Sequence, residues 1–158
     1  MAGLTILEFD DSLAAAFHDI NAEWIRAMFV LEPHDQHVLS HPRETIVDPG
    51  GAILFVAGSD GMVLGTGALM PTGGGGVELT KMGVLEAARG TGAGAFLLAA
   101  LVEKGRAMGA DPLYLLTSSK CEAAIHLYEK VGFAHDVGVM ADYGATYQRC
   151  DVAMRFAG

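Results

Sequence analysis

The sequence Val84-Leu-Glu-Ala-Ala-Arg89-Gly90-Thr91-Gly92-Ala93-Gly94 joins an apolar strand, predicted over residues 77–84, to an amphipathic helix predicted from about 91 to 108. A helix start leaves several backbone N–H groups without partners and carries a partial positive charge, so a phosphate can bind there. The glycines in this turn remove Cβ atoms that would keep a ligand away from those amides. The stretch therefore predicts a cradle for a phosphate group.

Three glycine-loop motifs compete for this turn. A Walker A loop requires Gly-x-x-x-x-Gly-Lys-[Ser/Thr], and no Gly-Lys pair follows here. The short dinucleotide fingerprint fits Gly90-x-Gly92-x-x-Ala95, with Asp111 about twenty residues further on. In that motif, however, the first glycine ends the strand, whereas here Leu85 to Arg89 separate the strand from the glycines. The order of elements therefore favours the third motif, [Arg/Gln]-x-x-Gly-x-[Gly/Ala].

The third motif is matched in full by the residues from Arg89 to Gly94, and a second pattern follows it. From Leu115 to Phe133, a strand precedes a helix that carries Ala-Ile-x-Leu-Tyr-Glu-Lys-x-Gly-Phe. These two motifs, in this order and on these elements, resemble the signatures of the GNAT superfamily of N-acetyltransferases. The resemblance covers most of the chain, strongly from about Ala52 to Phe133 and weakly before and after.

The fold class that we expect is α/β in a single domain, residues 1–158. We predict a mixed sheet of about seven strands with four helices, antiparallel at first and parallel where residues 77–84 meet residues 113–117. Two of the four helices are expected in the first 31 residues, with a break before Asn21. The resemblance implies that the two parallel strands splay apart and admit the pantetheine arm of acetyl-CoA.

Composition sets limits on the partners of this chain. Apolar residues make up 51% of its 158 residues and charged residues 18%, which is typical of a globular, core-forming chain. The net charge of −9 argues against nucleic acid, which requires clustered Lys and Arg. This acidity would suit a cationic amine substrate, although solubility explains it equally well. Local backbone amides, together with Arg89, would then hold an anionic cofactor.

The sequence also indicates where the protein acts. The first residues lack the basic start of a signal peptide, and the longest apolar stretch, Ala95 to Val102, is too short to span a bilayer. Cys121 and Cys150 show no metal spacing and need not pair, which fits a reducing compartment. We therefore expect a cytoplasmic protein that does not bind membranes, and the resemblance adds that a homodimer is common in the family.

The cofactor residues follow from the resemblance. It implies that main-chain groups of Met82, Gly83 and Val84 bond the pantetheine of acetyl-CoA like an added strand, and that CoA is released as product. The amides expected to hold the pyrophosphate belong to Arg89, Gly90, Thr91, Gly92, Ala93, Gly94 and Ala95. Lys130 is expected to neutralise a phosphate at the distal end of the cofactor. Many members carry an asparagine near Ser118 to Cys121 that bonds the pantetheine. This chain has serine hydroxyls there, which can replace that amide only in part. Ser118 and Cys121 are expected to belong to the cofactor site.

Two side chains are expected to carry the chemistry. An alkyl amine has a pKa of about 10, so a base must take a proton before the amine attacks a thioester. The resemblance assigns that role to Glu78, and a period of two along the strand predicts that residues 78, 80, 82 and 84 share a face. It also assigns Tyr128 as the general acid, which would protonate the departing sulfur. The backbone N–H groups around residues 82–84 would stabilise the negative charge on the carbonyl oxygen.

Several alternatives remain open at this point. The chain could be a catalytically silent acyl-CoA-binding or regulatory module, or a dinucleotide-binding protein. Cys121 could act as an acylated nucleophile, although the family generally transfers directly in a ternary complex. One sequence pattern suggests a metal site, and it consists of His34, His37 and His41. These histidines are expected in a loop on the acceptor side, so we predict no metal site. The acceptor is a small-molecule or peptide amine whose contacts come from residues 24–42 and 136–148.

Overall fold

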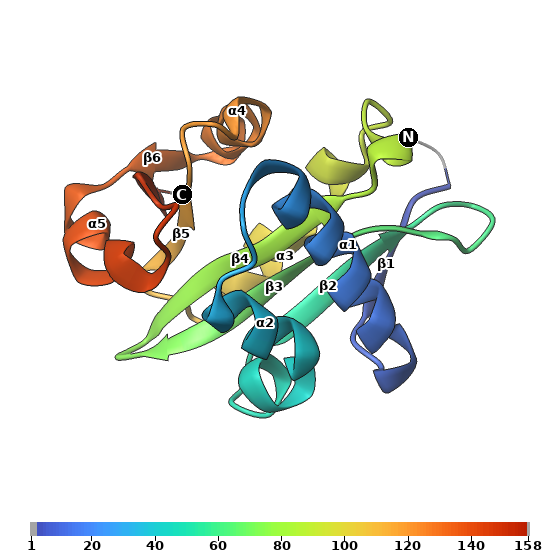
Figure 1. Ribbon diagram of the computed structural model, residues 1–158, viewed down its shortest axis with the longest axis horizontal. Helices are drawn as coiled ribbons and strands as arrows, with labels where there is room; N and C mark the ends of the chain where they lie inside the picture. Colours follow the sequence, from blue (N-terminus) through green and yellow to red (C-terminus); the bar gives the residue numbers. More distant parts are fainter. Residues whose placement is uncertain (1–2, 158) are drawn as a thin grey trace.

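The computed structural model describes residues 3 to 157, in which seven strands form one sheet of order β1-β2-β3-β4-β5-β7-β6 (Figure 1). The strands are β1 Thr5–Glu8, β2 Ala52–Ala57, β3 Val63–Gly73, β4 Gly76–Val84, β5 Leu113–Thr117, β6 Phe133–His135 and β7 Val152–Phe156. Within the described residues, β4 and β5 form the one parallel pair, and all other neighbours are antiparallel. The predicted mixed sheet and the position of its parallel pair are confirmed.

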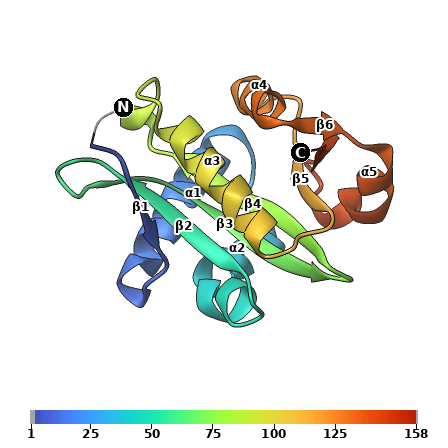
Figure 2. The same cartoon turned by 180° about the vertical axis from the view of Figure 1, so that it is seen from behind.

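Helices cover both faces of the sheet. They are α1 Ala14–Met28, α2 Pro33–Ser40, α3 Ala93–Ala107, α4 Glu122–Val131 and α5 Val137–Tyr143. A π-helical turn, Arg43–Val47, follows α2, and 3-10 turns occur at Asp11–Leu13, Glu86–Ala88 and Gly144–Thr146. Figure 1 shows α1 and α2 in front of β2, β3 and β4, and Figure 2 shows α3 on the opposite face. None of the helices described is long and apolar enough to cross a membrane.

Three expectations about the helices were wrong. The two helices expected before residue 32 are one continuous helix, α1, because no proline or glycine interrupts it. The expected loop around the three histidines is α2, which begins at Pro33 with a reciprocal capping box between Glu32 and Asp35. The segment after β6, where none of the four expected helices lies, contains α5. Its first turn is capped by the Asp136 carboxylate, which accepts from the backbone N–H of Val139. The described part of the chain thus contains five α-helices, where four were predicted.

Two apolar clusters hold these layers together. Leu97, Leu98 and Leu101 of α3 are fully buried against one face of the sheet. Phe17 and Ile25 of α1 are buried against the other face. Burial of a large apolar side chain contributes about 1.5–3 kcal/mol, so both helices are firmly anchored and can position the loops at their ends.

The strand β4 departs from regular geometry in its middle. Thr66 of β3 pairs with Gly83, whereas Ala68 pairs with Thr80, so β4 holds one extra residue between those pairs. This β-bulge includes Lys81, whose φ of 52° is unusual for a residue with a side chain. The expected face shared by residues 78, 80, 82 and 84 is therefore wrong.

The bulge lets two successive side chains of β4 face the same way, because Thr80 and Lys81 both contact the hydroxyl of Tyr147. Thr80 contacts Tyr147 and Lys81 contacts Asp35 of α2, whereas Met82 and Val84 pack with the cluster under α3. The pairing of β4 with β5 also ends below the bulge, at Leu79 and Leu115. Beyond that point the two strands continue without pairing, which confirms the expected splay and opens space between them.

Candidate active site

The larger cavity of the site is a cleft of about 530 Å³ between the end of β4, the turn before α3 and the first half of α4. Gly90 and Gly92 line it with φ values of 80° and 85°, a conformation that glycine adopts without strain. A Cβ built on either glycine meets no protein atom within 4 Å. The protein therefore leaves open the space where a side chain would stand, as a cradle for a ligand requires.

The start of α3 is prepared for an anion. Its N-cap is Gly92, which has no side chain that could accept from the amides of the first turn. These amides point along the helix axis toward the cleft end and carry the partial positive charge of the helix start. A CoA pyrophosphate fits the donors present here, and Arg89, which also lines the cleft, adds a cation.

Most of the predicted cofactor residues reach this cleft. The predicted residues that line it are Met82, Gly83, Val84, Arg89, Gly90, Gly92, Gly94, Ala95 and Cys121. Ala93 is buried beneath the turn, and the hydroxyl of Thr91 donates to the backbone oxygen of Ala88. Lys130 lies exposed in the last turn of α4 and does not line the cleft. Ser118 lines a neighbouring cavity instead.

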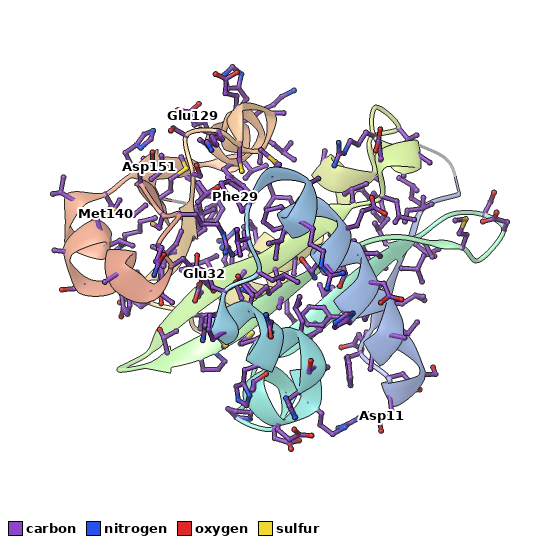
Figure 3. All side chains as sticks on the ribbon, in the orientation of Figure 1. Asp11, Phe29, Glu32, Glu129, Met140 and Asp151 are labelled. Atoms are coloured by element: carbon purple, nitrogen blue, oxygen red, sulfur yellow. The ribbon has the colours of Figure 1, made fainter. Side chains whose placement is uncertain are left out.

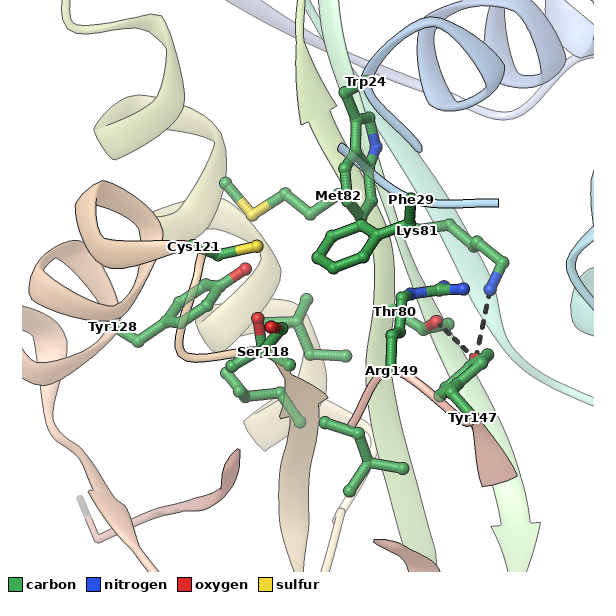
Figure 4. Close-up of a pocket in the computed structure, with 14 residues that line it drawn as sticks. Trp24, Phe29, Thr80, Lys81, Met82, Ser118, Cys121, Tyr128, Tyr147 and Arg149 are labelled. Atoms are coloured by element: carbon green, nitrogen blue, oxygen red, sulfur yellow. Dashed lines mark hydrogen bonds between the residues drawn. The ribbon is translucent and has the colours of Figure 1, made fainter. Parts of the chain in front are cut away.

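That second cavity, of about 50 Å³, lies where β4 and β5 diverge (Figure 4). We call it the acceptor cavity. The residues that line both it and the cofactor cleft are Trp24, Met82, Thr117, Cys121 and Tyr128. The two cavities therefore meet at these side chains. Gly83 must be a glycine here, because a Cβ would overlap the ring of Trp24.

Tyr128 extends from α4 into this junction. Figure 4 shows its hydroxyl and the Cys121 sulfur directed toward one another at the edge of the acceptor cavity. Burial raises the pKa of the Tyr128 phenol above its ordinary value, so the phenol carries its proton at neutral pH and is a weaker acid than a free phenol. The predicted general acid thus lies between the two cavities.

Glu78 lies one layer deeper. Its side chain is 2% exposed and does not line either cavity. Its carboxylate accepts a hydrogen bond of 3.2 Å from the hydroxyl of Tyr147, which does line the acceptor cavity. Burial raises the pKa of Glu78, which moves this carboxyl toward the range of a useful base. Glu78 is therefore connected to the acceptor cavity by its hydrogen bond with Tyr147.

A buried charge cluster, formed by Glu32, Asp35, Lys81 and Arg149, lies beside Tyr147. The Lys81 ammonium donates to Asp35 at 2.9 Å and to the Tyr147 hydroxyl at 3.1 Å. Arg149 donates to both oxygens of Asp35, at 2.7 and 2.8 Å, and to Glu32 at 3.2 Å. Figure 3 shows Glu32 on the connection between α1 and α2.

The pKa values in this cluster follow from burial and pairing. Burial alone would raise the pKa of Asp35, but the hydrogen bonds from Arg149 and the charge of Lys81 hold it well below its usual range. Burial lowers the pKa of Lys81, and the pairing with Asp35 opposes that shift. The sequence reasoning missed this cluster. The Glu32-Pro-x-Asp35 capping pattern was a signal for α2, but nothing local points to Arg149.

The three histidines lie on or next to α2. The His37 and His41 rings are 4.9 Å apart, and the His34 ring lies 5.4 Å from that of Tyr147. Burial and the charge of Lys81 lower the pKa of His34. Among residues 3–157, no group of three or more His, Cys, Asp or Glu side chains could hold a metal ion.

A strand pair that splays beside a glycine-rich helix start, with a cofactor cleft on one side and an acceptor cavity on the other, defines an acyl-CoA-dependent acyltransferase. The chain belongs to the Acetyltransferase (GNAT) family, whose model matches residues 14–133. It is an N-acetyltransferase, and its cofactor is acetyl-CoA. The predicted family and cofactor are confirmed.

One relative agrees with the family, and two solved structures agree with the fold. The uncharacterized N-acetyltransferase YjgM of Escherichia coli K12 is 31% identical over 136 residues, which cover 82% of this chain and 78% of that protein. A GNAT-family acetyltransferase from Staphylococcus aureus shares the fold with a TM-score of 0.84 at 19% identity, covering 96% of this chain and 97% of the other. The structure of yncA from Salmonella typhimurium, solved with acetyl-CoA, has a TM-score of 0.73 at 22% identity, with 97% and 92% covered.

Proposed function

We propose that the chain transfers an acetyl group from acetyl-CoA to a primary amine by direct attack within a ternary complex. The observation that carries this proposal is the junction of the two cavities at Met82 and Tyr128. A thioester held in the cofactor cleft and an amine held in the acceptor cavity would meet there. Such an arrangement converts a bimolecular encounter into a step between positioned groups.

The proposed step balances as follows. Bound acetyl-CoA supplies an activated acetyl thioester. The amine nitrogen forms a C–N bond to the acetyl carbon, the C–S bond breaks, and its electron pair leaves with the sulfur. The Tyr128 hydroxyl donates a proton to that sulfur while the amine loses a proton to a base, so the products are an amide and a thiol. The backbone N–H groups around Met82 to Val84 would stabilise the charge on the carbonyl oxygen.

Glu78 is the base in this proposal, and Tyr147 connects it to the amine. The Tyr147 oxygen can accept two hydrogen bonds, and Lys81 supplies one of them. The Thr80 hydroxyl, 3.2 Å from the same oxygen, is in place for the other. An acceptor amine would replace it, and Tyr147 would pass its own proton to Glu78 along their 3.2 Å hydrogen bond. The raised pKa of Glu78 supports this role, because a base works best when its pKa is close to the working pH.

The cofactor part of the proposal assigns the pyrophosphate to the amides from Arg89 to Ala95 and the pantetheine to residues 82–84. Ser118 and Cys121 line the far wall, where they would contact the pantetheine end. Lys130 is exposed, so it would meet only a part of the cofactor that extends out of the cleft.

Thiol release from acetyl-CoA over a panel of primary amines tests the proposal. At least one amine should release thiol, and Tyr128→Phe, which removes only the hydroxyl, should lower kcat by about 10²- to 10⁴-fold. Acetyl-CoA should still raise the unfolding midpoint of that variant. Thermal stabilisation by acetyl-CoA without thiol release on any amine would instead support a silent acyl-CoA-binding module, and unchanged kcat in the variant would remove Tyr128 from the mechanism.

A further inference from the structure

The charges at the acceptor cavity have one sign. Among the described residues that line the cavity, the charged side chains are Lys81 and Arg149, and no Asp or Glu lines it. The carboxylates that pair with them, Asp35 and Glu32, approach from the far side of the buried charge cluster. An acceptor that enters the cavity therefore meets no carboxylate. The cation within its reach is Arg149, whose side chain is 14% exposed, since that of Lys81 is 2% exposed.

Some of these donors have no partner in the protein. Arg149 uses its two terminal nitrogens for Asp35 and Glu32, and no residue in the described range accepts from its Nε–H or from the second hydrogen on Nη2. The Lys81 ammonium has three hydrogens, and it donates two of them, to Asp35 and to Tyr147. Because Glu32 and Asp35 balance the two cations, the cavity offers unsatisfied donors rather than a large net charge.

Aromatic rings hold the guanidinium in place. The Arg149 guanidinium lies 4.7 Å from the centre of the Tyr147 ring and 5.7 Å from that of Phe29. Its side chain is only 14% exposed, and Asp35 binds it in a bidentate manner. A guanidinium fixed in this way presents a preorganised planar edge, which matches the two oxygens of a carboxylate.

We propose that the acceptor is a small amine that also carries a carboxylate, of the amino acid class, and that this carboxylate binds to Arg149. This inference rests on the proposed amine acetylation. The cavity of about 50 Å³ holds only a small group, so the amine and the carboxylate of the acceptor must lie close together. A polyamine has no carboxylate that could bind to Arg149, so it should be a poor acceptor.

Matched acceptors test the carboxylate directly. Initial rates of thiol release are measured with the full chain and acetyl-CoA for the free amino acids, their carboxamides, the corresponding decarboxylated amines and spermidine. For the amino acid that is acetylated best, kcat/KM should exceed that of its carboxamide and its decarboxylated amine by at least about tenfold, since a charge-assisted hydrogen bond is worth about that factor. Equal or faster acetylation of the carboxamide, the amine or spermidine would overturn the proposal.

Variants separate the carboxylate contact from general damage. Arg149→Gln should raise KM for the amino acid by about tenfold or more and abolish the preference over the carboxamide. Glu32→Gln, which removes a competing carboxylate from Arg149, should lower KM for the amino acid. Arg43→Gln is the matched control, because Arg43 forms an exposed pair with Asp11 away from the cavity. An unchanged carboxylate preference in folded Arg149→Gln would contradict the assignment, and unfolding midpoints with acetyl-CoA confirm that each variant folds and binds cofactor.

A binding measurement covers the case in which no acceptor turns over. In the CoA-loaded chain, an amino acid should raise the unfolding midpoint further and its carboxamide should not, and the absence of this difference would overturn the carboxylate site. If acetyl-CoA and CoA themselves produce no shift, the proposed function fails instead. The two failures are therefore distinguishable.

Discussion

Replacing Asp35 with asparagine should destabilise the protein strongly, because it breaks the centre of the buried charge cluster. Asp35 is fully buried and accepts hydrogen bonds from Lys81, from both terminal nitrogens of Arg149 and from the backbone N–H of Glu32. An asparagine in the same position keeps the shape but loses the charge, and its NH₂ group would face N–H donors. Lys81, which is almost fully buried, would then have no ionic partner.

The size of the effect follows from this burial. Removing one partner of a buried ion pair costs about 3–5 kcal/mol, and Glu32 still compensates Arg149, so the lower end of that range applies. For a chain of 158 residues the unfolding entropy is about 0.33 kcal/mol per kelvin. A loss of about 3 kcal/mol should therefore lower the unfolding midpoint by about 9 °C. Circular dichroism or calorimetric melts at neutral pH measure this shift.

Asp11→Asn is the matched control, since it removes the same charge from an exposed pair. Asp11 bonds to Arg43 at 2.8 Å, but its side chain is 75% exposed. Exposed pairs contribute about 0–1 kcal/mol, so this variant should melt within about 3 °C of the parent. Equal midpoints for the two variants would refute the view that Asp35 stabilises a buried cluster.

The pH dependence gives a second readout of Asp35. Its pKa in the folded state lies below the unfolded value of about 3.9, so the folded state binds fewer protons in that range. The stability that Asp35 contributes is complete above about pH 5 and is lost as the pH falls toward the folded pKa. Asp35→Asn should lack this component, and its midpoint should fall less steeply than that of the parent below about pH 4.

Three further predictions concern the cleft and the chemistry. Gly92→Leu should abolish the stabilisation by acetyl-CoA, which is about 2.7 kcal/mol at a hundredfold excess over Kd. Gly109→Leu should keep this stabilisation, because Gly109 lies at the other end of α3, with a φ of 75° and equally open space around it. Glu78→Gln should lower kcat by about 10²-fold and remove the rise of kcat with pH that follows ionisation of Glu78. Tyr147→Phe should reproduce this loss. An unchanged pH profile of kcat in both variants would exclude proton transfer through Tyr147 to Glu78. Cys121→Ala should change kcat by less than about tenfold, and complete loss with intact cofactor binding would instead favour a covalent route.

The parts of the fold that could be predicted from the sequence depend on local patterns. Apolar runs located β4 and β5, and the glycine turn located the start of α3 within two residues. The break expected before Asn21 was an error of local interpretation, because its amide in fact bonds within α1, to the backbone oxygen of Phe17. The capping box at Glu32 was a readable signal for α2 that the three histidines obscured.

The missed part of the site depends on contacts between distant residues. A period of two along β4 holds only if the strand is regular, and Lys81 interrupts it with a left-handed backbone conformation. That conformation costs roughly 1–2 kcal/mol for a residue with a side chain, and the ion pair to Asp35, 46 residues away, can offset this cost. Arg149 joins the same pair from a segment 114 residues from Asp35. No spacing within one segment could show that these side chains meet.

The net charge of the chain does not set the sign of either binding surface. With a net charge of −9, the sequence offered acidity as a reason to expect a cationic acceptor. At the acceptor cavity, the carboxylates of Asp35 and Glu32 bind Lys81 and Arg149 and do not line the wall. The charged side chains that line the wall are therefore those two cations. At the cleft, backbone amides of α3 supply positive potential that does not enter a count of side chains. Both surfaces can therefore favour anionic groups on an acidic protein, and the proposed carboxylate acceptor follows from the pairing pattern rather than from composition.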